Sequence, residues 1–169
     1  MSNHARQYIG ILAAIAAYYI IHAGAHLIYA VCTGVFRQVK FMGLGVQVDV
    51  SVERMSDTRL AVFCLVGALA TLAAGCFMTV FADKICRAKN KLVRASSYYI
   101  TIALLAIDPL YLSVLCGLFG GGDMNGIALL CPEPAARCAF GVLLILNIIV
   151  FIKHILPTYK RSFSESNSK

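Results

Sequence analysis

The stretch from residue 8 to residue 36 contains no Lys, Arg, Asp or Glu, and this run constrains the fold more than any other feature of the sequence. A helix that crosses the hydrocarbon core of a bilayer needs about 20 apolar residues. The chain as a whole is 60% hydrophobic and 14% charged, whereas a soluble domain carries about 25% charged residues. Three further apolar runs follow the first one. The expected spans are residues 8–35, 60–82, 97–119 and 135–156.

These runs predict an all-α, multi-pass integral membrane protein with four transmembrane helices. The first run has no basic segment followed by a short apolar region and a cleavage site, so we expect a retained helix and not a signal peptide. Residues 1–156 are expected to form one membrane domain. Residues 157–169 form a polar tail, whose end, 161–169, has a composition typical of disorder.

The net charge of +7 is concentrated at the ends of the predicted spans. This distribution is typical of membrane topology and of contact with anionic lipid, and it does not favour a nucleic-acid partner. The orientation in the membrane and the oligomeric state stay open at this point. The basic residues between spans two and three and in the tail are Lys84, Arg87, Lys89, Lys91, Arg94, Lys160 and Arg161.

An alternating segment follows the first span. In "VQVDVSVE" (46–53) every second residue is Val, which predicts a short membrane-associated β-strand with one face on an apolar surface. Gly43 and Gly45 precede it and permit a bend. A strand with an open edge could pair with an extended peptide. The alternative is an interfacial loop that alternates without forming a strand.

Small residues recur along one face of the second span, at Gly67, Thr71 and Gly75. This spacing lets two helices approach closely in lipid, and packing alone is sufficient to explain it. Two acidic residues belong to the third span and to the segment that follows it. Asp108 precedes Pro109, where its alternative role is to support a helix kink, and Asp123 follows three glycines, where its alternative role is that of a loop residue.

Two histidines, His22 and His26, lie one helical turn apart in the middle of the first span. Residues four apart share one face of a helix, so both rings can bind one metal ion from one side. Haem is disfavoured because its axial ligands lie on opposite faces of the ring. A quinone site, a proton relay or a simple hydrogen-bonding role between helices remain as alternatives.

The order of these motifs resembles that of the site-2 protease family of intramembrane zinc metallopeptidases. "HAGAH" (22–26) is similar to the H-E-x-x-H zinc motif, and "VKFMGLGVQVDV" (39–50) stands where the family has a strand-rich segment. "GALATL" (67–72) stands at the G-P-x-x-N motif and "GGGDMNGI" (120–127) at the Asp-Gly motif. The resemblance covers roughly residues 18–130.

The resemblance implies a Zn²⁺ site with His22, His26 and Asp123 as ligands. Asp123 is followed by Met124 and not by the glycine of the family motif, so Asp108 is the reserve for the third ligand. The resemblance and the predicted strand together imply a transmembrane or membrane-associated peptide substrate. The residues expected to contact it are Val46, Val48, Val50, Gly67 and Thr71.

Ala23 and Thr71 are among the departures from the family pattern, as is Ala68 at the position of the motif proline. Ala23 is the important one because it stands where H-E-x-x-H enzymes have the general base. Loss of such a base lowers the rate by about 10²–10⁴. Ala23 is explained either by a natural pseudoenzyme or by a deliberate Glu→Ala exchange, and the otherwise intact motifs favour the exchange.

The sequence therefore predicts an intramembrane zinc metallopeptidase in a form that is inactive because of Ala23. The alternative from a different class is a non-catalytic binding module that holds transmembrane segments in the same groove. A small redox or quinone-binding bundle is the third hypothesis.

Overall fold

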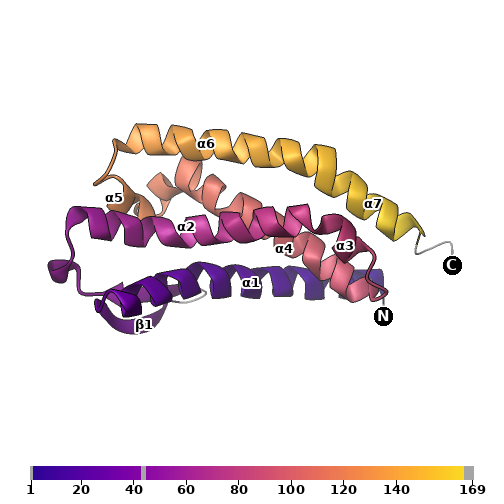
Figure 1. Ribbon diagram of the computed structural model, residues 1–169, viewed down its shortest axis with the longest axis horizontal. Coiled ribbons are helices and arrows are strands. Elements are labelled where there is room, and N and C mark those ends of the chain that lie inside the picture. Colours follow the sequence, from indigo (N-terminus) through magenta and orange to yellow (C-terminus); the bar gives the residue numbers. More distant parts are fainter. Residues whose placement is uncertain (1, 43–44, 166–169) are drawn as a thin grey trace.

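The computed structural model describes residues 2–42 and 45–165 (Figure 1). Helices dominate, and a two-stranded antiparallel sheet follows the first of them. The main helices and strands are α1 (Asn3–Cys32), β1 (Phe36–Met42), β2 (Gly45–Val50), α2 (Asp57–Val80), α3 (Ala82–Cys86), α4 (Lys91–Leu110), α5 (Asp123–Ile127), α6 (Glu133–Val150) and α7 (Leu156–Glu165).

Among the described residues, four helical segments are long and apolar enough to cross a membrane. This confirms the prediction of four helices with the length and composition to span a membrane, although the boundaries differ from the expected ones. The first helix begins earlier because the Ser2 hydroxyl caps it by accepting a hydrogen bond from the Ala5 amide. The four segments are His4–Cys32, Asp57–Val80, Lys91–Leu118 and Glu133–Ser164.

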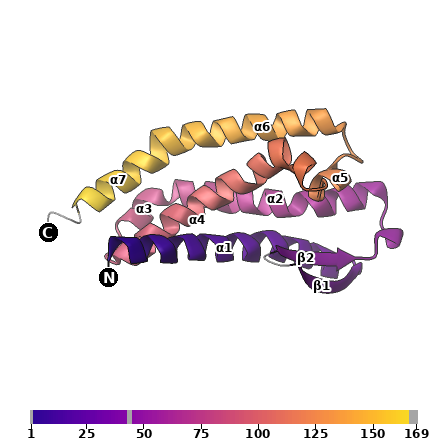
Figure 2. The same ribbon diagram turned by 180° about the vertical axis from the view of Figure 1, so that it is seen from behind.

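The helices form three layers in the two ribbon views. α2 and α4 lie in the middle, with α1 on one side and α6 on the other (Figures 1 and 2). α1 packs against both α2 and α4, whereas α6 packs mainly against α4 and the turns that follow it. Residues on α1 therefore meet α2 and α4 inside the bundle.

The expected strand is present, but it ends earlier than the alternation. β2 covers Gly45–Val50, and Val52–Arg54 turns into a short 3₁₀ helix. β1 pairs with β2 antiparallel, with Val39 opposite Val48. Gly43, one of the two glycines expected at the bend, lies outside the described residues.

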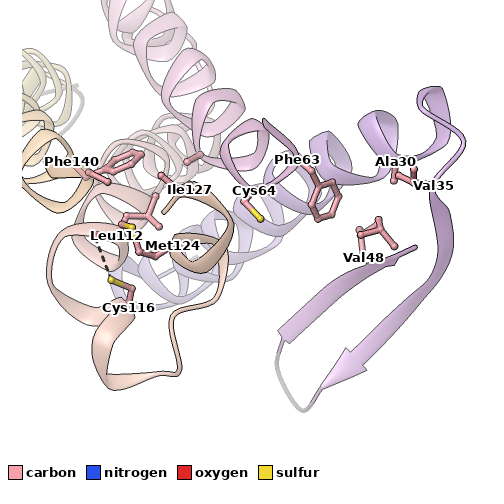
Figure 3. Close-up of a cluster of buried hydrophobic side chains, with 13 residues drawn as sticks. Ala30, Val35, Val48, Phe63, Cys64, Leu112, Cys116, Met124, Ile127 and Phe140 are labelled. Atoms are coloured by element: carbon pink, nitrogen blue, oxygen red, sulfur yellow. Dashed lines mark hydrogen bonds between the residues drawn. The ribbon is translucent and has the colours of Figure 1, made fainter. Parts of the chain in front are cut away.

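A hydrophobic cluster attaches the sheet to the helices (Figure 3). Val48 and Val50 are buried against α1 residues such as Ala30 and against Phe63 of α2. The cluster continues to Met124 of α5, so the sheet, α2 and the α5 turn share one core. This core fixes the two segments that flank the histidine pair.

α4 changes its helical form after Pro109. A π-helical turn (Tyr111–Leu115) and a 3₁₀ turn (Cys116–Leu118) follow it. Proline has no N–H, so the carbonyl of Leu105 lacks its usual helical donor. The Asn147 side chain of α6 supplies a donor instead, with its Nδ2 2.7 Å from the Leu105 oxygen. Asn147, and not Asp108, therefore compensates the backbone at the proline.

The disorder predicted for the tail is wrong for residues 161–165, which continue helix α7. Composition suggested a solvated tail, but α7 is held by side chains that face the bundle. Tyr159 is buried against α3 and α4, and Ser162 accepts a hydrogen bond from Nη1 of the buried Arg94 at 3.0 Å. Residues 166–169 of the predicted tail lie outside the described residues.

Candidate metal centre

The two histidines of α1 face the same point inside the bundle. His22 and His26 lie one turn apart, and their Nε2 atoms are 3.2 Å apart. His26 is 6% exposed and lies with its ring 4.7 Å from the ring of Phe63 on α2. His22 is partly buried and its ring stacks on Tyr18, one turn earlier on the same helix. The shared face predicted from their spacing is confirmed.

A carboxylate from a distant part of the chain completes this group. Asp123 is the first residue of α5, and its Oδ2 lies 3.4 Å from Nε2 of His22 and 3.6 Å from Nε2 of His26. The three preceding glycines have φ values of +78°, +86° and +47°. Residues with a side chain rarely adopt this left-handed conformation, so the glycines allow the chain to turn sharply just before Asp123.

α5 is held against α2 by a second close approach. A Cβ atom on Gly126 would lie 2.3 Å from Sγ of Cys64 and 3.4 Å from the carbonyl oxygen of Leu60. Glycine is therefore the residue that lets α5 rest on α2 at this distance. Because Gly126 lies three residues after Asp123, this contact sets how far Asp123 reaches toward the histidines.

The spacing of the three ligand atoms fits a single metal ion. Zinc binds His nitrogen and carboxylate oxygen at about 2.0–2.2 Å in a tetrahedral arrangement, which separates any two ligand atoms by about 3.3–3.6 Å. The three observed separations are 3.2, 3.4 and 3.6 Å. His22, His26 and Asp123 together could therefore hold a metal ion.

Gly67 makes room for the histidine rings. A Cβ atom at this position of α2 would lie 2.4 Å from Nε2 of His26 and 2.8 Å from Cε1 of His22. Any side chain there would displace the ring nitrogens that could bind the ion. The close helix approach expected at the small residues of span two is present at Gly67, which contacts the histidine rings.

Asp108, the reserve ligand, lies on the other side of His22. Its carboxylate oxygens are 3.2 and 3.3 Å from Nδ1 of His22, and Oδ1 accepts a hydrogen bond from the Tyr18 hydroxyl at 2.6 Å. The Thr71 hydroxyl also donates to it. Asp108 therefore contacts the nitrogen of His22 that faces away from His26 and Asp123, and it does not complete the ligand group.

Of the residues expected to contact a substrate, four fall into two groups, and the fifth, Val46, is half-buried on β2. Gly67 and Thr71 lie at the site, in contact with the histidine rings and with Asp108 respectively. Val48 and Val50 are buried in the hydrophobic cluster, so their side chains are engaged within the protein. Among the described residues, the acidic side chains in contact with the histidine pair are Asp108 and Asp123.

The sequence reasoning missed Tyr18. It lies four residues before His22 and thus on the same helix face as both histidines, and that spacing was the available signal. A polar aromatic residue at this position has a hydroxyl that must find a partner inside the bundle. It finds Asp108.

No family model matches the chain, and no curated protein or solved structure matches it either. The arrangement of the site is therefore the basis for inferring a function.

Proposed function

We propose that this chain is an intramembrane zinc metallopeptidase similar to the site-2 proteases, in a form that binds cation and substrate but lacks the general base. The observation that carries the proposal is the convergence of His22, His26 and Asp123 at separations that suit zinc. Two imidazoles and one carboxylate leave room for a further ligand, as in catalytic zinc sites. The two histidines lie on a helix long enough to span a bilayer, and Asp123 lies on the short helix α5.

The sheet supplies a means of holding a substrate. Within the described residues β2 pairs with β1 alone, so its other edge carries backbone groups without a strand partner. A membrane helix hides its peptide bonds in its own hydrogen bonds and must unwind before hydrolysis. We expect the unwound segment to pair with this edge of β2, while Val48 and Val50 keep the strand anchored to the core.

The ligand group accounts for part of the chemistry only. A bound divalent cation supplies Lewis acidity, which polarises a carbonyl group and makes water more acidic. Peptide hydrolysis also needs a group that moves a proton from water to the leaving nitrogen. Ala23 has no such group, and Asp108 is already bound by Tyr18, Thr71 and His22. The chain as it stands should bind the cation and cleave very slowly.

The test combines metal content with a gain of activity. Purified protein should contain about one zinc per chain, and His26→Ala should remove it. Ala23→Glu should raise the cleavage rate of a single-span membrane substrate by about 10²–10⁴. Ala23→Gln is the matched control, because a glutamine side chain is nearly the same size as glutamate but cannot accept the proton from water. Protein without zinc in both the parent chain and the Ala23→Glu variant would contradict the proposal.

A second candidate function is favoured by the same alanine. A chain that keeps the ligand group and the open strand edge but lacks the base could hold transmembrane segments without cutting them. Photo-crosslinking from β2 to a single-span protein, together with no cleavage by Ala23→Glu, would support this binding module. Cleavage by Ala23→Glu that Ala23→Gln does not reproduce would support the peptidase.

A further inference from the structure

Asp108 is a carboxylate placed within a helix that is apolar enough to span the membrane. It is 2% exposed and lies on α4 directly before Pro109. Acidic groups at such positions are costly unless they are bonded, and they usually have a function. The kink itself does not require Asp108, because Asn147 already donates to the free carbonyl of Leu105. Asp108 therefore needs another explanation.

The contacts of Asp108 all lead to His22. Tyr18 donates to Oδ1 at 2.6 Å and also stacks its ring on His22, with ring centroids 5.3 Å apart and planes inclined by 24°. Thr71 donates from α2, and its hydroxyl also lies 2.9 Å from the carbonyl of Ala68. Tyr18 thus contacts both partners in the pair, and Asp108 joins three helices around one imidazole ring.

The bond between Asp108 and His22 fixes a proton. An ionised carboxylate only accepts hydrogen bonds, so the contact at 3.2 Å requires the proton of a neutral ring to be on Nδ1. The lone pair of Nε2 is then directed at the point shared with His26 and Asp123. A ring held in this way is prepared to bind a cation before the cation arrives.

The second histidine lacks this arrangement. Among the described residues, Nδ1 of His26 is buried and has no hydrogen-bond partner. Its ring is positioned by packing against Phe63 and by the close approach of Gly67. The two ligands are therefore oriented by different means, one by a buried carboxylate and the other by shape.

We propose that Asp108, supported by Tyr18 and Thr71, is the positioning residue of the cation site, which holds His22 in the tautomer and orientation that present Nε2. The inference rests on the proposed function only in that a cation binds to this site. Carboxylates that accept from a metal-binding histidine typically contribute 10–100-fold to metal affinity. We assign that role to Asp108. Its contact with Nδ1 of His22 accounts for most of the orientation of the ring.

The experiment measures Zn²⁺ affinity in detergent by competition with a chromophoric chelator. Asp108→Asn should weaken zinc binding by about 10–100-fold. Tyr18→Phe and Thr71→Val should each weaken it by a few-fold, because each removes one hydroxyl and leaves the carboxylate in place. Asn147→Leu is the matched control, since it removes a part-buried hydrogen bond to the same helix without touching the ligands, and its zinc affinity should be unchanged.

A second measurement reports on the ring itself. In a background with His4→Gln and His154→Gln, only the pair contributes histidine ¹⁵N signals. In zinc-free protein His22 should show a protonated Nδ1, and Asp108→Asn should lose or broaden that signal. A role limited to helix packing would leave the tautomer unchanged. If Asp108→Asn does not fold, Asp108→Glu and Tyr18→Phe are compared in the same two measurements.

The outcomes separate the two proposals. Zinc affinity and ¹⁵N signals that stay unchanged in Asp108→Asn, or in both substitute variants, overturn the positioning role while the zinc site stands. A parent chain that binds no zinc overturns both proposals. Zinc binding that weakens in Asp108→Asn, together with no cleavage by Ala23→Glu, supports the positioning role and counts against the peptidase.

Discussion

α5 and α7 lie toward opposite ends of the bundle, and each lies beside a cluster of polar side chains (Figure 1). Near α7, Nη1 of Arg94 donates to the carbonyl and the hydroxyl of Ser162, and Ser162 donates to the carbonyl of Cys86. Near α5, His22, His26 and Asp123 turn their ligand atoms toward one another. The first cluster joins a positive group to its acceptors, and the second gathers three candidate ligand atoms around one point.

This difference distinguishes a structural contact between helices from a binding site. At Arg94 the bonds run from the Nη1 donor to acceptors on Ser162 and link α4 to α7, while Nε of Arg94 has no hydrogen-bond partner among the described residues. At the histidines, two ring nitrogens and a carboxylate oxygen face one another at 3.2–3.6 Å, and Nδ1 of His22 contacts Asp108. Such a group gains stability from a cation at its centre. Buried polar contacts alone would not have distinguished the two.

The largest expected effect is that of Gly67→Ala on the histidine cluster. The new Cβ would lie 2.4 Å from Nε2 of His26, so the rings must move and zinc affinity should fall by at least about 100-fold, since such sites tolerate displacements of only about 0.5 Å. Alanine favours helix over glycine by about 1 kcal/mol, so α2 itself should persist. Circular dichroism and zinc competition measure the two effects.

Gly24→Ala is the matched control for this substitution. No atom lies within 4 Å of a Cβ placed on Gly24, although it is a neighbour of both histidines in sequence. Its zinc affinity should match that of the parent chain. Equal zinc affinity in Gly67→Ala and Gly24→Ala would show that the close packing of Gly67 on the histidine rings is not needed for zinc binding.

Arg94→Leu should affect the other cluster alone. It removes the donor to Ser162, and hydrogen bonds to charged groups contribute about 1.5–3 kcal/mol. α7 should detach more often, which hydrogen exchange over residues 156–165 would measure, while zinc affinity stays unchanged. Arg161→Leu, an exposed neighbour of Ser162, controls for the loss of one positive charge. A loss of zinc in Arg94→Leu would show that the two clusters are coupled.

A smaller effect is expected where α5 rests on α2. In Gly126→Ala the added Cβ would meet Sγ of Cys64 at 2.3 Å, which should displace Asp123 and weaken zinc binding about tenfold, or ~1.4 kcal/mol. Adding Cys64→Ala removes that sulfur atom and should restore most of the affinity. If the double variant binds zinc as weakly as Gly126→Ala, the clash with Cys64 does not set the position of Asp123.

The smallest effect concerns the sheet, which belongs to neither cluster. Hydrogen bonds from Lys40 and Gln38 lower the pKa of Asp49 below its ordinary value. A lowered pKa adds stability above the ordinary aspartate value of about 3.9, and this contribution is lost as the pH falls through the lowered pKa. The protection of residues 36–50 from hydrogen exchange, measured relative to the unfolded chain at the same pH, should therefore fall slightly below about pH 4 in the parent chain but not in Asp49→Asn. An equal loss of protection in the parent chain and in Asp49→Asn would show that Asp49 does not stabilise the sheet in this way.

The parts of the fold that depend on local periodicity could be predicted from the sequence. The shared face of His22 and His26 follows from the helical repeat, and β2 follows from alternation. The partner strand β1 is harder to predict, because a bulge between Phe36 and Gln38 shifts the alternation within it. The apolar residues of β1 consequently do not recur at every second position.

The contacts between distant segments could not be predicted in the same way. Asp123 was expected at the site only through the motif order, and its placement depends on the glycine turn and on the contact of α5 with α2. The pairing of Asp108 with His22 depends on how α4 is rotated in the bundle, and nothing local specifies that rotation. Composition failed at α7 because one buried arginine orders a polar segment.

The hydrogen bond between Asn147 and the carbonyl of Leu105 constrains how this sequence can evolve. A descendant that replaced Pro109 would regain the normal helical donor for that carbonyl, and the Asn147 amide would lose this acceptor among apolar side chains. A descendant that lost Asn147 first would leave the carbonyl oxygen of Leu105 without the donor that replaces the missing N–H of Pro109. The proline and the asparagine should therefore be inherited, or abandoned, as a pair.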